Sequence, residues 1–319
     1  MENEILVSVV CLTYNHEKYI EKAIKSMLNQ ETDFKYEIIV HDDCSQDATP
    51  EILKSHIAKY PDKIRIILQN ENQHSKGTNI LDDIVLPVAR GKYIAFCEGD
   101  DYWVDDKKLQ KQIGAFAKHP ECWICAHQVK KINADDTKRI GQIAPSDKNV
   151  IFSTTEVIAG NGDFVGTNSL IINKKVFDIN YKFWKKYRID YFLQIMGSLK
   201  GGMIYLSDEM SAYRCCSDNS WTSRMLKNPQ KHIEHFQKMI DTLEQLNVDT
   251  DGIYNDIINK KVIYQKFNIL KIEKRYKDIF KKENYDILRE ISGREKIKLI
   301  IKICFPFVDK VMEWRKYAK

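Results

Sequence analysis

Along the first hundred positions, the apolar residues follow two different patterns: short continuous runs, and a spacing of three and four residues. Short runs of β-branched and aromatic residues predict strands at residues 5–12, 36–40, 64–68 and 93–97. Apolar residues at the three- and four-residue spacing of a helix predict helices at residues 16–30, 47–60 and 79–90. Thr49 and Pro50 suit the start of the second helix, and Gly91 suits the end of the third.

This order of strands and helices predicts an α/β fold with a Rossmann-like, mostly parallel sheet flanked by helices. Farther along, the alternation loosens. It predicts strands near residues 122–132, 149–152, 168–172 and 203–206. A helix is expected over residues 188–199, and the chain from residue 229 onward has a helical pattern. We therefore expect one domain over residues 1–225 and a helical region over residues 226–319.

Polar clusters follow three of the predicted strands. They are Thr13-Tyr14-Asn15, Asp42-Asp43 and Glu98-Gly99-Asp100-Asp101. Ligands of parallel sheets bind beyond the carboxyl ends of the strands, where the loops converge. The sequence therefore predicts a binding site at this edge of the sheet.

The acids of the third cluster are hard oxygen ligands, which suit Mg²⁺ or Mn²⁺ held together with a diphosphate. A metal there would act as a Lewis acid on a leaving diphosphate. Helix capping is the alternative, because Asp105 and Asp106 begin a further predicted helix. Asp42 and Asp43 fit a second metal site, nucleoside binding or a simple turn after a strand.

The charge of the chain is unevenly distributed. Its net charge is +5, which does not indicate a nucleic-acid partner. Residues 225–319 contain 21 Lys and Arg against 14 Asp and Glu, whereas the first 224 residues contain 29 against 31. The basic surplus falls in a region whose predicted helices have apolar stripes. Examples are the stripe of Phe236, Met239, Ile240 and Leu243 and the segment 296–317, which mixes apolar and basic residues. These helices fit a membrane surface, a homodimer contact or ordinary packing.

The chain has eight cysteines and no sequence feature that indicates export. Its first four residues lack the basic start of a signal peptide, and no apolar run approaches the length of a spanning helix. We therefore expect a cytoplasmic protein with reduced thiols. Cys122 and Cys125 have the spacing of a zinc or redox pair, but a buried strand explains the same residues.

Four segments in order carry a family resemblance. They are VSVVCLTYNHEKYIEKAIKSMLNQ, YEIIVHDDCSQDAT, GKYIAFCEGDDYWVDDKKLQKQ and RIDYFLQ. Together they resemble glycosyltransferase family 2, whose members have the GT-A fold, and the resemblance covers about residues 4–220. It implies an inverting transferase that uses a nucleotide-diphosphate sugar.

The resemblance also implies roles for the donor-side residues. The segment Thr13–Asn15 would line the nucleotide pocket, with Tyr14 close to the base. Asp42 and Asp43 would bind the nucleoside. The segment Glu98-Gly99-Asp100-Asp101 matches the DxD motif of the family, with Asp100 as the metal ligand and Glu98 near the ribose or sugar.

Asp190 matches the catalytic base of the family, although a helix-dipole role explains an acid there as well. The base would deprotonate an acceptor hydroxyl, which then attacks the anomeric carbon. The resemblance leaves open which of Arg214, Arg224 and Lys76 would contact the diphosphate. Cys215 stands where many members of the family have a histidine.

Aromatic and glycine-rich positions are weaker candidates. Trp103 and Trp221 fit sugar stacking or burial, and the segment 160–168 fits an acceptor loop or a plain surface loop. The sequence thus predicts a metal-dependent transferase acting from a UDP-sugar on a glycan or lipid-linked acceptor. A non-catalytic nucleotide- or glycan-binding module is the alternative. A sugar-nucleotide pyrophosphorylase is weaker, because no glycine-rich loop follows the first strand.

Overall fold

The computed structural model describes residues 4–215 and 228–304. The chain divides into two compact units, residues 1–184 with 188–218 and residues 185–187 with 219–319. The division expected near residue 225 stays a prediction.

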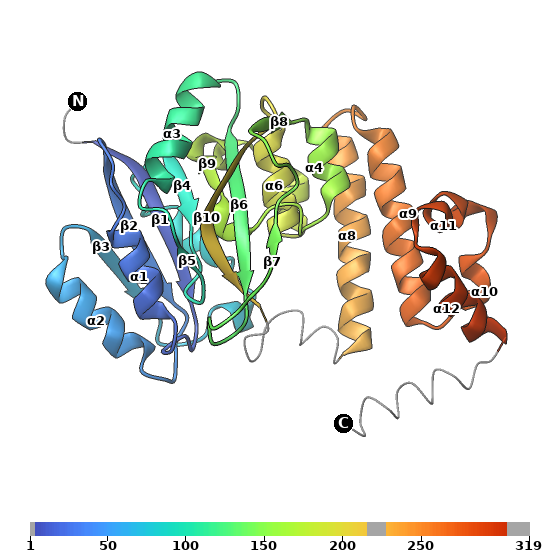
Figure 1. Cartoon of the computed structure of the whole chain (residues 1–319), viewed down its shortest axis with the longest axis horizontal. Helices are drawn as coiled ribbons and strands as arrows, with labels where there is room; N and C mark the ends of the chain where they lie inside the picture. The colour runs from blue at the N-terminus through green and yellow to red at the C-terminus, as the bar shows by residue number, and fades with distance from the viewer. Residues whose placement is uncertain (1–3, 216–227, 305–319) are drawn as a thin grey trace. The chain divides into compact units, whose positions relative to one another are not determined.

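Four parallel strands form the first half of the sheet in the N-terminal unit (Figure 1). They are β1 (Ile5–Thr13), β2 (Lys35–Asp42), β3 (Ile64–Leu68) and β4 (Tyr93–Phe96). Their order is β3-β2-β1-β4, so their carboxyl ends lie along one edge. The strands predicted from the apolar runs are therefore confirmed.

The second half of the sheet starts with a reversal. Strand β9 (Ile171–Asn173) is antiparallel to β4 on one side and to β6 (Ile124–Ile132) on the other. Strand β10 (Met203–Arg214) then pairs in parallel with β6 over nine registered residue pairs. Short antiparallel strands complete the sheet, namely β5 (Tyr102–Trp103), β7 (Arg139–Ile143) and β8 (Val150–Phe152). The predicted fold, a mostly parallel sheet flanked by helices, is confirmed.

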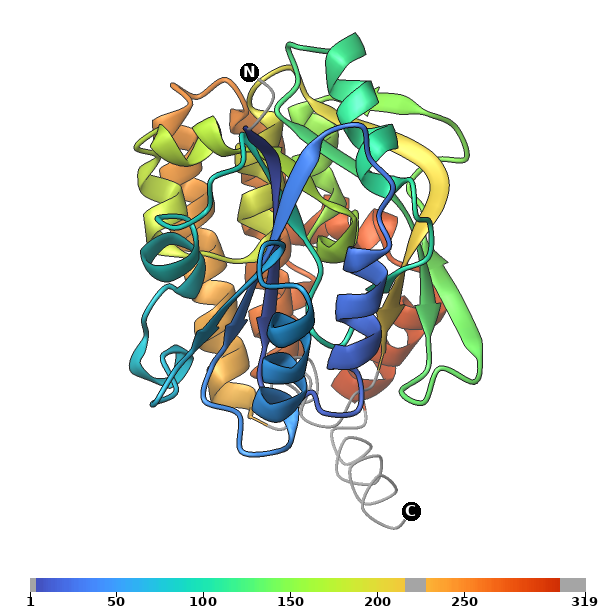
Figure 2. The ribbon, with the colours of Figure 1, turned by 90° about the vertical axis from the view of Figure 1, so that its left-hand side faces the viewer.

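Alternation along β1 explains which helices cover which face. Val7, Val9 and Cys11 point to one face and share a core with the long helices of the first half of the unit. These helices are α1 (Ile20–Leu28), α2 (Thr49–Lys59) and α3 (Lys108–Lys118). Figure 2 shows α1 and α2 on one side of the sheet, and the teal η2 (Ile80–Val85) on the other.

Shorter elements complete the N-terminal unit. They are η1 (His74–Lys76), α4 (Thr154–Gly160), η3 (Thr167–Ser169), η4 (Lys174–Asp178) and α6 (Asp190–Ser198). Helix α5 (Lys182–Lys186) begins in this unit, and its last two residues belong to the other unit. The helix predicted over residues 79–90 was wrong in type and length. A six-residue π-helix forms instead. Pro87 lies two residues after it and opposes its extension, because proline lacks the N–H that would continue the helical turns.

The Cys122–Cys125 pair belongs to the packing around β6. Cys125 lies in the strand, Cys122 lies just before it, and both side chains are buried. Burial raises the pKa of the Cys122 thiol to about 11 and that of Cys125 to about 12. Zinc and redox chemistry both need the thiolate, so the interpretation as a buried strand is the one that these positions support.

The C-terminal unit is helical. It contains α8 (Pro229–Asp249), α9 (Asn255–Ile272), α10 (Tyr276–Ile279), η5 (Lys282–Asn284), α11 (Tyr285–Glu290) and α12 (Gly293–Cys304). A core joins the later helices through Phe267, Tyr276, Ile279, Ile287 and Leu299. None of the helices in residues 4–215 and 228–304 is long and apolar enough to cross a membrane.

Candidate functional site

The three polar clusters meet at the carboxyl edge of the sheet. Gly99 donates its backbone N–H to the carbonyl of Leu12 at 3.0 Å, and Asp43 donates to the carbonyl of Thr13 at 3.0 Å. The loops after β2 and β4 are therefore both tied to the end of β1. The convergence predicted from the strand pattern is present.

The segment after β1 turns sharply and leaves Tyr14 open to solvent, with 44% of its surface exposed. Asn15 adopts a left-handed backbone with φ of 56°, a conformation that asparagine tolerates better than most residues. Its side-chain oxygen accepts the N–H of Gln46, and its own N–H donates to Ser45. Asn15 thus joins the loops after β1 and β2 and holds Tyr14 at the surface.

Asp42 and Asp43 are both buried, and their carboxylates are engaged by the protein. Asp42 accepts the N–H and hydroxyl of Ser45. Asp43 accepts the N–H groups of Gln73 and His74 at 2.7 and 3.1 Å, which fixes the start of η1. These bonds support the turn interpretation of the pair, and nucleoside binding by the two residues stays a prediction.

Residues 98–101 form what we call the acidic loop, and Gly99 allows its compact backbone path. A Cβ atom at this position would lie 2.6 Å from the hydroxyl oxygen of Thr13 and 2.8 Å from Nδ1 of His16. Both of these polar atoms are buried without a hydrogen-bond partner in the structure. A side chain larger than hydrogen would push the loop away from β1, so the close approach depends on glycine.

Asp101 supports the acidic loop from beneath. It is buried, and its two carboxylate oxygens accept hydrogen bonds from the N–H of Arg214 at 2.9 Å and from Nδ2 of Asn168 at 2.8 Å. Arg214 is buried as well. Its guanidinium donates to the carbonyls of Asp100 and Ala134 and stacks on the ring of Tyr19. The last residue of β10 therefore fixes the backbone that carries Asp100.

Asp190 joins the acidic loop from a distant part of the chain. It begins α6, its side chain is exposed, and one of its oxygens accepts the hydroxyl of Thr167. Surrounding protein raises the pKa of Asp190 although the side chain reaches water, and the bond from Thr167 opposes that rise.

Glu98 is the group that links Asp190 to the acidic loop. Burial raises the pKa of Glu98 well above its ordinary value, and the negative charges of Asp190, Asp100 and Asp101 raise it further. Burial and the charge of Asp100 likewise raise the pKa of Asp101. Asp190, Asp100 and Asp101 therefore all act on Glu98, which makes this end of the sheet an acidic site.

The carboxylate chemistry fits a divalent cation shared with a phosphorylated ligand. Within the described part of the chain, no three His, Cys, Asp or Glu side chains are placed to surround one metal ion. Mg²⁺ and Mn²⁺ are commonly held by one or two carboxylates, with phosphates and water completing the coordination. A cation would also relieve the repulsion around half-buried Glu98 and Asp100.

The remaining sequence candidates lie in several environments. Lys76 is exposed on η1 and pairs with Glu71. Trp103 is buried, and its indole N–H donates to the carbonyl of Asn168 at 3.0 Å, which supports a packing role. Arg224 and Trp221 lie outside the described residues.

Sequence reasoning missed several residues that shape the site. Thr167 and Asn168 belong to the segment 160–168, for which the sequence suggests an acceptor loop or a plain surface loop but no individual residue. Asp82 of η2 accepts hydrogen bonds from Trp184 and Arg188, and so ties η2 to the chain just before α6. No local motif marks these three residues, because each partner lies far away in the sequence.

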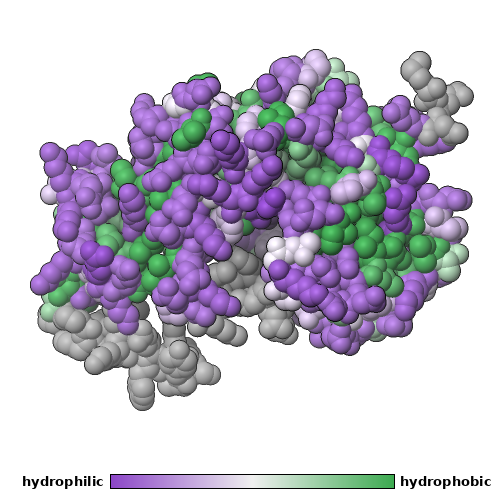
Figure 3. Space-filling model, turned by 180° about the vertical axis from the view of Figure 1, so that it is seen from behind, coloured by the Kyte–Doolittle hydropathy of each residue, from purple (hydrophilic) through white to green (hydrophobic). Residues whose placement is uncertain are grey.

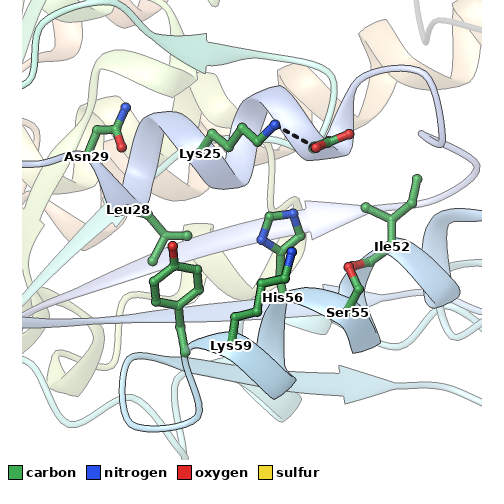
Figure 4. Close-up of a pocket in the computed structure, with 9 residues that line it drawn as sticks. Lys25, Leu28, Asn29, Ile52, Ser55, His56 and Lys59 are labelled. Atoms are coloured by element: carbon green, nitrogen blue, oxygen red, sulfur yellow. Dashed lines mark hydrogen bonds and ion pairs between the residues drawn. The ribbon is translucent and has the colours of Figure 1, made fainter.

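A separate pocket lies between α1 and α2, with a volume of about 270 Å³ (Figure 4). Figure 4 shows Lys25 and Leu28 of α1 facing His56 and Lys59 of α2. None of the predicted site residues lines it.

The structure defines an α/β protein with acidic residues beyond the ends of its parallel strands, and comparison with known proteins identifies the family. Residues 8–215 match the family model described as glycosyl transferase family 2. The chain therefore belongs to glycosyltransferase family 2. An uncharacterized protein of Mycobacterium tuberculosis is 35% identical over 219 residues, which is 68% of this chain and 61% of that protein. This chain thus spans about three fifths of the length of that relative.

Two further relatives have descriptive names. The putative teichuronic acid biosynthesis glycosyltransferase TuaG of Bacillus subtilis is 38% identical over 108 residues, 34% of this chain and 40% of that protein. The crystal structure of Staphylococcus aureus TarS, residues 1–349, in complex with UDP-GlcNAc has a TM-score of 0.58 at 18% identity. The match covers 84% of this chain and 81% of that one and shows the shared fold.

Proposed function

We propose that this protein is a metal-dependent, inverting glycosyltransferase that transfers a hexosyl or N-acetylhexosaminyl group from a UDP-sugar. The acceptor is a hydroxyl of a glycan or of a lipid-linked saccharide in the synthesis of a cell-surface polysaccharide. One observation carries the proposal. The loop after β4 carries Glu98 and Asp100 to the end of β1, where burial and the negative charges of Asp190, Asp100 and Asp101 raise the pKa of Glu98.

The proposed donor site uses the edge formed by β1, β2 and β4. Tyr14 is exposed beside the strand ends, where a nucleoside base can stack on its ring. Asp100 would hold Mn²⁺ or Mg²⁺, and Glu98 would approach the ribose or the sugar. The metal supplies positive charge to the diphosphate. Asp101 and Arg214 hold the backbone of this loop in place.

Asp190 is proposed as the general base. Its carboxylate accepts the proton of the acceptor hydroxyl while the hydroxyl oxygen forms a bond to the anomeric carbon. The bond between that carbon and the diphosphate oxygen breaks, and UDP leaves with the electron pair. Attack from the face opposite the diphosphate inverts the configuration.

The uncharacterized relatives do not identify the donor, so the proposal on the donor draws on two named proteins. TarS has been crystallised with UDP-GlcNAc and is described as a poly(ribitol-phosphate) β-N-acetylglucosaminyltransferase, and TuaG is described for teichuronic acid biosynthesis. Both names point to cell-surface polymers. A cytoplasmic location agrees with the free thiols at positions 11, 44, 97, 122, 125 and 304.

A donor screen tests this function. UDP release is measured for a panel of UDP-sugars with Mn²⁺, with Mg²⁺ and with EDTA, with and without saccharide acceptors. We expect Asp100→Ala to abolish metal-dependent turnover. We expect Asp190→Asn to bind UDP as the parent does and to lose transfer by at least about a hundredfold, the scale of general-base catalysis.

Asp135→Asn is the matched control, because Asp135 is an exposed acid on the β6–β7 loop that bonds only with its own turn. Its turnover should equal that of the parent. Tight UDP binding without turnover across the whole panel would instead identify a nucleotide- or glycan-binding module. Transfer retained by Asp190→Asn would assign the base to another residue.

A further inference from the structure

Helix α12 (Gly293–Cys304) has apolar residues on two sides. Leu299 is buried in the core of the C-terminal unit. Ile297, Ile300 and Ile301 lie three and four positions apart and are 58, 48 and 39% exposed. Residues at that spacing share one helix face, so the three side chains form a continuous apolar stripe, which we call the isoleucine stripe.

The other apolar stripes of this unit are used for packing. Met239, Ile240 and Leu243 of α8 are buried, as are Ile258 and Val262 of α9. The predicted amphipathic pattern of α8 and α9 is therefore explained within the described structure. Only α12, among the helices of residues 228–304, leaves three large aliphatic side chains open on one face.

The charges beside the isoleucine stripe are positive. Arg294 and Lys298 are exposed on α12, and Lys302 is half-buried with its ammonium 3.3 Å from the hydroxyl of Tyr276. Glu295 is the single acid of the helix, and its carboxylate pairs with Lys271 at 2.6 Å. The exposed face of α12 therefore combines the isoleucine stripe with the cations of Arg294 and Lys298.

We infer that the isoleucine stripe is a docking surface for an anionic lipid bilayer. A helix of twelve residues is about 18 Å long, which is too short to cross a bilayer but suits a position in the plane of the interface. The isoleucines enter the acyl boundary, while the long stems of Lys298 and Arg294 let their charges reach the headgroups.

A second copy of the chain is a poorer occupant of the same face. Pairing two identical stripes would place cations of both copies beside the contact, and like charges at an interface oppose association. An anionic surface instead gains from every cation. The inference concerns only the C-terminal unit and does not depend on the donor, the metal or the base proposed above.

Vesicle co-sedimentation of the full chain tests the inference. The protein is mixed with 100-nm vesicles of phosphatidylcholine alone or with one third phosphatidylglycerol. We expect binding to the anionic vesicles that falls with added salt, and at least tenfold weaker binding to neutral ones. Ile300→Asp should lower the partition coefficient on anionic vesicles at least tenfold.

Ile253→Asp is the matched control, because Ile253 is 75% exposed in the turn between α8 and α9. It should bind vesicles as the parent does. Circular dichroism and thermal melting verify that both variants are folded, and Lys298→Glu provides a second variant that weakens binding without removing apolar surface.

Two results would overturn the inference. One is that the parent does not bind anionic vesicles, or that Ile300→Asp and Ile253→Asp bind them equally well. The other is a dimer, measured by light scattering, that Ile300→Asp converts to a monomer, which would assign the isoleucine stripe to a contact between copies of the chain.

Discussion

Removing the hydroxyl of Thr167 tests how Asp190 is held. Thr167→Val keeps the shape of the side chain and deletes the donor that bonds to the Asp190 carboxylate. Two effects follow. The carboxylate loses an orienting contact, and the pKa of Asp190, which the surrounding protein already raises, rises further because the Thr167 bond no longer lowers it.

The size of the effect follows from the exposure of Asp190. A hydrogen bond to a charged group contributes about 1.5–3 kcal/mol in mutational series, and water replaces part of it where the side chain is exposed. We therefore expect a loss of about 1 kcal/mol, or about fivefold in kcat near neutral pH. The base acts only when deprotonated, so a higher pKa moves the acidic limb of the kcat profile to higher pH.

UDP release in the presence of acceptor, measured from pH 5 to 9, separates these effects. Thr167→Ser retains a hydroxyl and should restore the parental profile, which a purely structural role of the threonine methyl would not explain. The reasoning is refuted if Thr167→Val has the parental kcat and the parental acidic limb, or if KM for the donor changes while kcat does not.

Two further predictions concern packing near the site. Gly99→Ala should weaken UDP binding at least tenfold in calorimetry, because the new methyl would meet Thr13 and His16, whereas Gly114→Ala, with open space around its Cβ, should bind normally. Lys108 is fully buried, its ammonium donates to Gln112, and burial lowers its pKa to about 7. The unfolded chain then binds more protons between about pH 7 and 10.5, so the free energy of unfolding should rise with pH across that window. Lys108→Met should remove this rise in urea titrations, and an equal slope in both proteins would contradict the burial argument.

Local patterns were sufficient to predict the framework of the site. The strands end where their apolar runs end, so the polar residues after β1, β2 and β4 could be placed at one edge before any contact was known. The spacing of apolar residues also predicted α1, α2 and α6. Helix 79–90 failed because Pro87 and a π-helical turn break a pattern that periodicity alone cannot distinguish from an ordinary helix.

Partnerships across the chain could not be predicted from the sequence. Asp43 was a candidate for the nucleoside, yet its carboxylate binds backbone groups thirty residues away. Asp100 and Asp101 are adjacent residues of the same type, but Asp101 is buried and accepts a hydrogen bond from the amide of Asn168, whereas Asp100 is half-buried. The role of each aspartate depends on which partner the tertiary fold brings within hydrogen-bond distance of its carboxylate. Residue type and local spacing do not predict that partner.

The anchoring of the acidic loop by Arg214 also constrains when the site can form during synthesis. The acids of the strand-end clusters all lie within the first 101 residues, but the guanidinium that holds the carbonyl of Asp100 lies 114 residues after Asp100 in the chain. Domains fold as units once their chain is complete. A nascent or truncated chain that stops before the end of β10 would therefore contain the whole acidic motif and still lack the contacts that fix it.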